Sequence, residues 1–334
     1  MRLRRSKVSG PGLRRIRRGR GFSYVDADGA PVTDPETLDR IRALAIPPAW
    51  RDVWICPQAN GHIQALGTDD AGRRQYLYHT EWRRARDEEK HDRVLALAAR
   101  LPEVRARIQE DLTVPGLGRE RVLAGALRVL DRGVFRTGGE EYAEENDSRG
   151  VATLLREHVR PRGGELLFDF PAKNGIERTV GIRDPELTRL IIALRRGRAD
   201  GERLFAYRNG SGERQELRAR DVNERFKQLA GDEFTVKDMR TWTATVLAAT
   251  EFATLDRPTS QRAARRVEAA VMRMVAEQLG NTPAVARRSY VDPRVCAAFQ
   301  EGRTIAAALE VAETLDGNDS RETLERATLD LLTR

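Results

Sequence analysis

Two cations lie three residues apart at the predicted start of a helix. Thr235-Val-Lys-Asp238 has the spacing of a capping box, which places Lys237 and Arg240 in the first turn, on one face. A helix N-terminus already presents free N–H groups and positive potential. The pattern favours a site for an anion such as a phosphate. The alternative is an ordinary helix start whose charges are solvated.

A second polar constellation lies at Leu279-Gly-Asn-Thr-Pro283. Gly280 has the position of a residue that ends one helix, and Thr282 followed by Pro283 begins the next. Asn281 therefore sits in a tight joint, and Tyr290 follows two turns further along the second helix. Tyrosine has a pKa near 10 and is a poor nucleophile unless cations share the charge that develops on its target. The alternative is two packed helices with an ordinary surface tyrosine.

Composition bounds the class of protein. The 334 residues carry a formal net charge of +8, which attracts polyanions, although a basic composition can also serve solubility alone. A chain of this length favours two domains. Cys56 and Cys296 form no disulfide framework or zinc spacing, which suits a reducing cytoplasm. We expect no metal, no cofactor, no export signal and no membrane span, which would need about 20 apolar residues.

The predicted organisation is α+β. Residues 1–20 are basic and poor in apolar side chains, so we expect a flexible arm that either follows phosphates or is simply solvated. Residues 21–90 read as a small domain rich in short strands, with a helix after Asp34-Pro35. Residues 91–334 read as a larger, mainly helical domain. No function is assigned to the polar tail after about residue 310.

Strand Gln75-Tyr-Leu-Tyr78 alternates, which places both tyrosines on one face and Gln75 with Leu77 on the other. The tyrosines could meet DNA or fill a sheet core. In the larger domain, Asn174-Gly175 between two alternating runs predicts a β-hairpin with Lys173 at its tip. The acidic run of residues 140–147 could hold Mg²⁺, but ion pairing that orients Arg136 is the favoured interpretation.

Four motifs, in one order along residues 20–295, resemble the type IB DNA topoisomerases of bacteria and poxviruses. They are Ile46-Pro-Pro-Ala-Trp50 with Arg73-Arg-Gln-Tyr-Leu-Tyr-His79, Phe135-Arg-Thr-Gly-Gly139 running on to Glu145-Asn-Asp-Ser-Arg-Gly-Val-Ala-Thr-Leu154, Lys237-Asp-Met-Arg-Thr-Trp242, and Gly280-Asn-Thr-Pro-Ala-Val-Ala-Arg-Arg-Ser-Tyr290. The resemblance implies a two-lobed clamp around duplex DNA, with a catalytic lobe of the tyrosine recombinase and topoisomerase IB type that contains a small β-sheet.

The resemblance also implies the site. Tyr290 would be the nucleophile, Arg136 and Arg240 would bind the phosphate, and Lys173 would act as general acid. Asn281 would donate to a phosphate oxygen at a position where many family members have histidine, so a role there in proton transfer is in doubt. Expected DNA contacts are Gln75, Tyr76, Tyr78, Tyr142 and Lys237.

The implied reaction is the relaxation of supercoiled DNA through a covalent 3′-phosphotyrosyl link, without ATP, by a monomer associated with the nucleoid. A tyrosine site-specific recombinase is the first rival, although such enzymes typically have histidine where Lys237 stands. A basic DNA-binding clamp without catalytic activity is the second.

Overall fold

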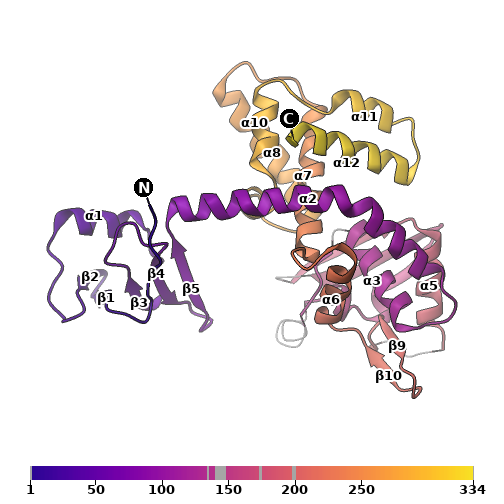
Figure 1. Ribbon diagram of the computed structural model, residues 1–334, viewed down its shortest axis with the longest axis horizontal. Coiled ribbons are helices and arrows are strands. Elements are labelled where there is room, and N and C mark those ends of the chain that lie inside the picture. Colours follow the sequence, from indigo (N-terminus) through magenta and orange to yellow (C-terminus); the bar gives the residue numbers. More distant parts are fainter. Residues whose placement is uncertain (1, 134, 140–147, 173–174, 198–200, 334) are drawn as a thin grey trace. The chain divides into compact units, whose positions relative to one another are not determined.

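The computed structural model in Figure 1 describes residues 2–133, 135–139, 148–172, 175–197 and 201–333. The chain forms two compact units, Met1–Lys90 and His91–Arg334. Helix α2 (Thr80–Thr113) begins in the first unit and continues into the second.

The first unit is built on an antiparallel sheet with the strand order β2-β1-β3-β4-β5. Ile41, Val53, Ile55 and Ala65 form its small core. Asp34 caps the only helix that lies wholly within the described part of this unit, accepting the backbone N–H of Thr37 at 2.8 Å. The elements are β1 (Leu13–Arg18), β2 (Gly21–Val25), α1 (Pro35–Ala43), β3 (Arg51–Ile55), β4 (Ile63–Thr68) and β5 (Arg74–Tyr78).

Strand β1 corrects one expectation. Leu13–Arg18 was predicted to belong to a flexible arm, but it pairs with both β2 and β3. The guanidinium of Arg15 donates to the carbonyl oxygens of Pro47, at 3.1 Å, and Trp50, at 2.6 Å. Carbonyl oxygens of a loop distant in sequence thus accept hydrogen bonds from an arginine that, judged from composition alone, would be expected to be solvated. The arginine-rich segment can therefore be ordered despite its few apolar residues.

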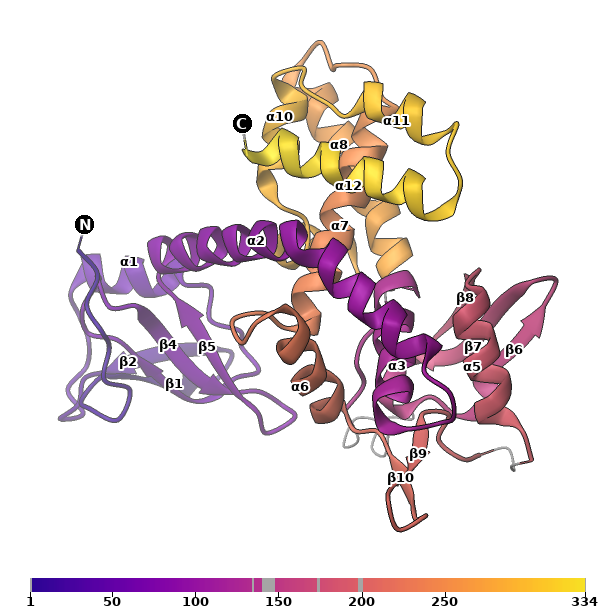
Figure 2. The same ribbon diagram turned by 45° about the vertical axis from the view of Figure 1, so that its right-hand side comes forward.

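The second unit is mainly helical, and helix α7 lies at its centre. Helices α3, α8, α10, α11 and α12 all pack on α7, whose Trp242 and Phe252 are buried (Figure 2). The helices are α3 (Arg119–Gly133), α5 (Pro185–Arg195), α6 (Ala219–Ala230), α7 (Val236–Ala253), α8 (Gln261–Leu279), α9 (Pro283–Ser289), α10 (Pro293–Gln300), α11 (Ala306–Ala312) and α12 (Gly317–Thr333).

Two small sheets complete this unit, so the predicted α+β class, with a small β-rich domain followed by a larger helical one, is confirmed. Strands β6 (Val159–Arg162), β7 (Glu165–Ala172) and β8 (Ile176–Ile182) form one sheet, and β9 (Ala206–Arg208) and β10 (Arg214–Glu216) form the other. Short 3₁₀ turns lie at Val151–Thr153 and Arg156–His158.

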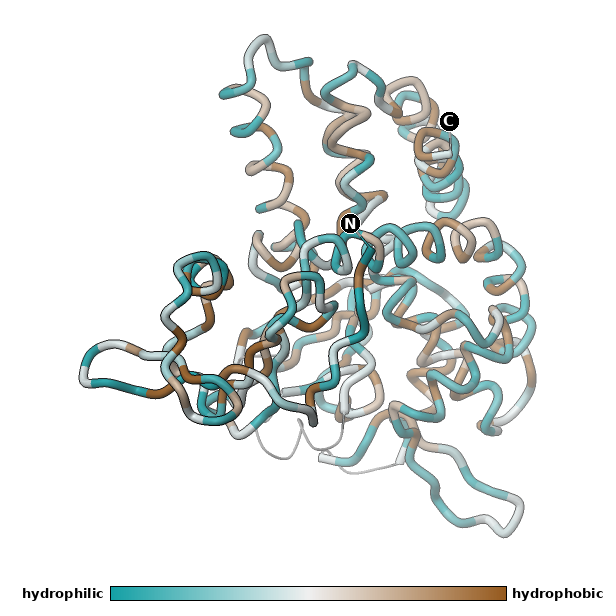
Figure 3. The backbone as a smooth tube through the Cα atoms, turned by 60° about the vertical axis from the view of Figure 1, so that its left-hand side comes forward, coloured by the Kyte–Doolittle hydropathy of each residue, from teal (hydrophilic) through white to brown (hydrophobic). Residues whose placement is uncertain are grey.

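Hydrophobic and hydrophilic residues alternate along the helices and strands, as expected for elements with one buried face (Figure 3). Within the described ranges, no helix combines the length and the apolar character that crossing a membrane requires.

The segment that follows α3 is held by aromatic packing. Phe135 is 2% exposed, stacks on Phe170 with ring centroids 5.0 Å apart, and meets the edge of Phe168 at 5.2 Å. Both partners lie on the buried face of β7. The side chain directly before Arg136 is therefore fixed on the sheet.

A close approach of two glycines fixes the same segment from its other side. Gly138 has a φ of +81°, and a Cβ added to it would lie 2.7 Å from the Cα of Gly150. The backbone N–H groups of Val151 and Ala152 donate to the carbonyl oxygens of Arg136 and Thr137 at 2.9 and 2.8 Å. This backbone pairing is possible only where neither glycine carries a side chain.

We expect Gly138→Ala to lower the free energy of unfolding by about 1–3 kcal/mol, because it combines backbone strain with a clash. Gly116→Ala is the matched control: Gly116 has a φ of +84° but no atom within 4 Å of the added Cβ. Urea unfolding of both variants separates the two effects. Equal losses of stability would show that the contact with Gly150 is unimportant.

Candidate active site

Arg136 reaches two of the side chains with which it was predicted to act. Its Nη1 lies 3.5 Å from the phenolic oxygen of Tyr290, a long contact, and its Nη2 donates to the Oδ1 of Asn281. These residues are 154 and 145 positions away in the sequence. The structure thus brings together three of the residues proposed for one site.

The joint between α8 and α9 forms as its sequence predicts. Gly280 is left-handed, with φ 60° and ψ 51°, and Thr282 caps α9 ahead of Pro283. The backbone N–H of Asn281 donates to the carbonyl oxygen of Ala276 at 2.8 Å. Its side-chain Nδ2 is buried and has no hydrogen-bond partner in the described part of the chain.

Tyr290 directly follows α9 and is only 6% exposed, which excludes the ordinary surface tyrosine. The hydroxyl of Thr245 on α7 lies 3.3 Å from the carbonyl oxygen of Tyr290 and 3.0 Å from that of Thr241, and these two acceptors share the single hydroxyl proton. The same hydroxyl accepts the N–H of Asp292 at 3.2 Å. Thr245 therefore fixes the backbone of the tyrosine on α7.

The predicted helix start carrying Arg240 is confirmed. Asp238 accepts the backbone N–H of Thr235 at 2.9 Å and pairs with Arg93 at 2.9 Å. The Arg240 guanidinium lies 5.3 Å from the ring centroid of Tyr290 and donates to the carbonyl oxygen of Leu279. Arg240 is 6% exposed, whereas Lys237 is exposed.

The electrostatics of this cluster favour an anion. Burial raises the pKa of the Tyr290 phenol, but the charges of Arg240 and Arg136 outweigh it and bring the pKa below its ordinary value. Burial and the like charge of Arg136 lower the pKa of Arg240. They also lower the pKa of Arg178 to about 10. Cations are held close together here, and a bound phosphate would relieve their repulsion.

Sequence reasoning missed Arg178 and Thr245. Both act on backbone carbonyl oxygens, and no residue type marks such an acceptor. Arg178 donates to the carbonyl oxygens of Gln278 and Leu279, next to the joint that holds Asn281. No local sequence motif predicts either contact.

The structure does not describe every residue predicted for the site. Lys173, Tyr142 and the acidic run lie outside the described residues. The hairpin itself is present, because Ala172 pairs with Ile176 across β7 and β8.

The remaining predicted residues lie in the first unit. Tyr76 and Tyr78 are each 39% exposed and stack with centroids 6.1 Å apart, so they do not fill a core. Gln75, on the other face of β5, donates to Asp69 at 2.9 Å.

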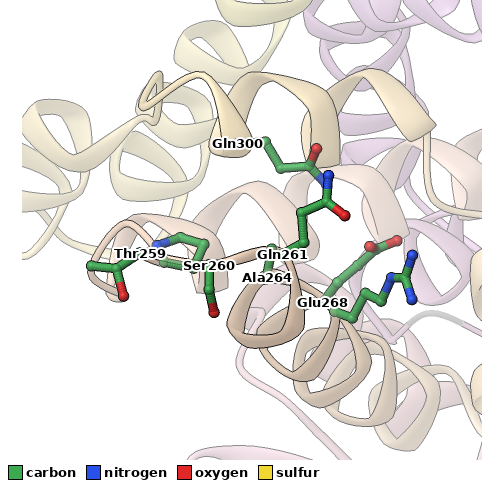
Figure 4. A pocket seen from close by; sticks show the side chains of 8 residues that line it. Thr259, Ser260, Gln261, Ala264, Glu268 and Gln300 are labelled. Carbon is green, nitrogen blue, oxygen red and sulfur yellow. The ribbon is translucent and has the colours of Figure 1, made fainter.

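Cavities also lie away from this cluster. One of about 490 Å³, at the beginning of α8, is lined by Thr259, Gln261, Glu268 and Gln300 among others (Figure 4). None of the predicted catalytic residues lines it, so it does not mark the proposed chemistry. Among the residues that the structure describes, no group of His, Cys, Asp and Glu could hold a metal ion.

Comparison with known proteins identifies the family. Residues 79–312 match the catalytic core of eukaryotic DNA topoisomerase I, and residues 21–69 match the N-terminal domain of bacterial DNA topoisomerase IB. DNA topoisomerase 1B of Acanthamoeba polyphaga mimivirus is 30% identical over 84% of this chain and 85% of its own. DNA topoisomerase 1B of vaccinia virus (strain Copenhagen) is 24% identical over 78% of this chain and 82% of its own. These matches favour a topoisomerase over a site-specific recombinase, and the chain belongs to the type IB DNA topoisomerases, enzymes that relax supercoiled DNA by transient cleavage of one strand.

Proposed function

We propose that Tyr290 is the nucleophile of this enzyme and that Arg136, Arg240 and Asn281 bind the phosphate it attacks. The observation that carries the proposal is the convergence of Arg136 and Arg240 on one buried phenol, with Asn281 on the same arginine. In the reaction the phenolic oxygen bonds to phosphorus, the bond to the 5′ oxygen breaks, and that oxygen takes up a proton. The products are a 3′-phosphotyrosyl link and a free 5′ hydroxyl.

The two arginines stabilise the phenolate form of the nucleophile and the negative charge that develops on the phosphate in the transition state. Their positive charge lowers the pKa of Tyr290 and so increases the phenolate fraction. In the transition state their guanidinium groups can hold both non-bridging oxygens, and each good donor contributes about 3 kcal/mol.

In the structure the same arginines donate to neutral acceptors. Arg136 bonds the amide oxygen of Asn281, and Arg240 bonds the carbonyl oxygen of Leu279. A phosphate oxygen carries more negative charge and competes well for such donors. The Nδ2 of Asn281, which has no hydrogen-bond partner among the described residues, supplies a further donor to the phosphate.

Lys173 is proposed to protonate the leaving 5′ oxygen, since a lysine near other cations has a lowered pKa. In the reverse direction it would accept that proton. The phosphotyrosyl link preserves the energy of the phosphodiester, so resealing needs no ATP, and rotation of the free end between the two steps relaxes supercoils.

DNA binding is proposed to use both units. Tyr76 and Tyr78 present stacked, half-exposed rings on one face of the sheet, a surface suited to duplex DNA. Gln75, Lys237 and Tyr142 are the further proposed contacts. We propose that the enzyme is a monomeric clamp that needs no metal or cofactor and acts on the nucleoid in the cytoplasm.

Tyr290→Phe is expected to abolish relaxation of a plasmid and to leave DNA affinity close to that of the wild type, because only the attacking oxygen is removed. The test is a denaturing gel with a duplex labelled at the 5′ end of the cleaved strand, with EDTA present and ATP absent. A labelled adduct that survives denaturation is expected for the wild type alone. Relaxation near the wild-type rate in the variant would refute the assignment.

Asn281→Ala is expected to slow single-turnover cleavage by about 10²-fold, the effect of removing one donor to the developing oxyanion. Asn281→His should retain most of the rate, because a neutral imidazole can accept from Arg136 and donate with its other nitrogen. Normal cleavage by the alanine variant would contradict the proposed geometry.

The Tyr290 phenol is expected to ionise below its ordinary pKa, so cleavage should accelerate with rising pH as the phenolate forms and should slow again at higher pH, where Lys173 loses the proton that it is proposed to donate. The difference between the tyrosinate absorbance of the wild type and of Tyr290→Phe, followed against pH, isolates this group. Arg136→Gln should raise the pKa because it removes a charge and a hydrogen bond. Arg303→Gln, on the surface, is the control. The same titration curve in both arginine variants would argue against the electrostatic role.

A further inference from the structure

Arg178 links three segments that lead to the proposed catalytic residues. It lies on β8, opposite Phe170 in the register of the hairpin. Its Nη1 donates to the carbonyl oxygen of Leu279 at 3.2 Å, and its Nη2 donates to those of Gln278 at 2.6 Å and Gly133 at 3.4 Å.

These acceptors belong to the last turns of two helices. Gly133 ends α3, and Leu279 ends α8. Carbonyl groups in a last turn lack partners within their helix and carry partial negative charge, so a cation is well placed there. The guanidinium also lies 5.9 Å from the ring centroid of Phe135, the residue that fixes the position of Arg136.

Each contact lies a short step from the proposed site. Gly133 precedes Arg136 by three residues, and Leu279 precedes Asn281 by two. The carbonyl oxygen of Leu279 is shared, because Arg240 also donates to it. One side chain thus contacts the backbone three residues before Arg136 and two residues before Asn281, and it shares a carbonyl acceptor with Arg240.

We propose that Arg178 is a positioning residue for strand cleavage, which holds the ends of α3 and α8 in the register that brings Arg136, Asn281 and Arg240 together. The inference rests on the proposed function of those three residues. It assigns Arg178 no contact with DNA.

Two simpler roles predict different behaviour. If Arg178 only added positive charge near the phosphate, a lysine would serve as well. If it only stabilised the fold, its loss would weaken DNA binding and lower the melting temperature together with the cleavage rate. A positioning role needs the planar fork, because an ammonium group lacks the fixed geometry that reaches several carbonyl oxygens at once.

The test compares Arg178→Lys and Arg178→Ala with the wild type in single-turnover cleavage, DNA affinity and thermal melting. We expect cleavage by both variants to fall by about 10²-fold, the effect of a small misplacement of catalytic groups. DNA affinity should stay within about twofold, and the lysine variant should melt close to the wild type, because lysine keeps the charge and the aliphatic stem.

Arg183→Lys is the matched control, because Arg183 directly follows β8 and its side chain is 82% exposed. It should cleave like the wild type. Cleavage by Arg178→Lys at the wild-type rate would overturn the inference, and so would a parallel loss of DNA affinity. Tyr290→Phe, assayed alongside, keeps the two proposals apart: if it still cleaves, the proposed function fails, whereas an inactive Tyr290→Phe with an unaffected Arg178→Lys refutes the role of Arg178 alone.

Discussion

The proposed site depends on one electrostatic constraint: the guanidinium groups of Arg136 and Arg240 lie near one another beside the buried phenol of Tyr290. Bringing like charges out of water is costly, and the lowered pKa of Arg240 reflects that cost. The protein offsets it with neutral acceptors, the amide oxygen of Asn281 and the carbonyl oxygen of Leu279. A phosphate bound at these guanidinium groups, as proposed, would offset their mutual repulsion further.

The ends of helices position the side chains of the proposed site. Arg240 follows the first turn of α7, which begins at Val236, whereas Asn281 lies just past α8 and Tyr290 lies just past α9. A helix end has a defined direction and unpaired backbone groups, so a side chain there is aimed by the helix and can also be tied by hydrogen bonds. Thr245 illustrates this, because a single hydroxyl on α7 bonds the backbone on both sides of Val291.

Sequence reasoning located these helix ends because their signals are local. Gly280, Thr282 and Asp238 each specify a backbone conformation or a cap within a few residues, and the structure has all three as predicted. The convergence of Arg136 with Tyr290 came from resemblance to a family, since no local rule joins residues 154 positions apart. The ordering of β1 was missed because composition treats Arg15 as a solvated charge, whereas a distant loop supplies its carbonyl partners.

The asparagine at position 281 fits the same electrostatic account. An amide offers one acceptor and two donors without charge, so its oxygen can bind Arg136 while its Nδ2 stays available for the phosphate. A protonated histidine at this place would have no acceptor for Arg136 and would add a further positive charge to the cluster. A neutral histidine could reproduce both hydrogen bonds. If Asn281 binds the phosphate as proposed, position 281 requires a neutral group that accepts from Arg136 and donates to the phosphate. Asparagine is always neutral, whereas histidine meets this requirement only in its unprotonated form.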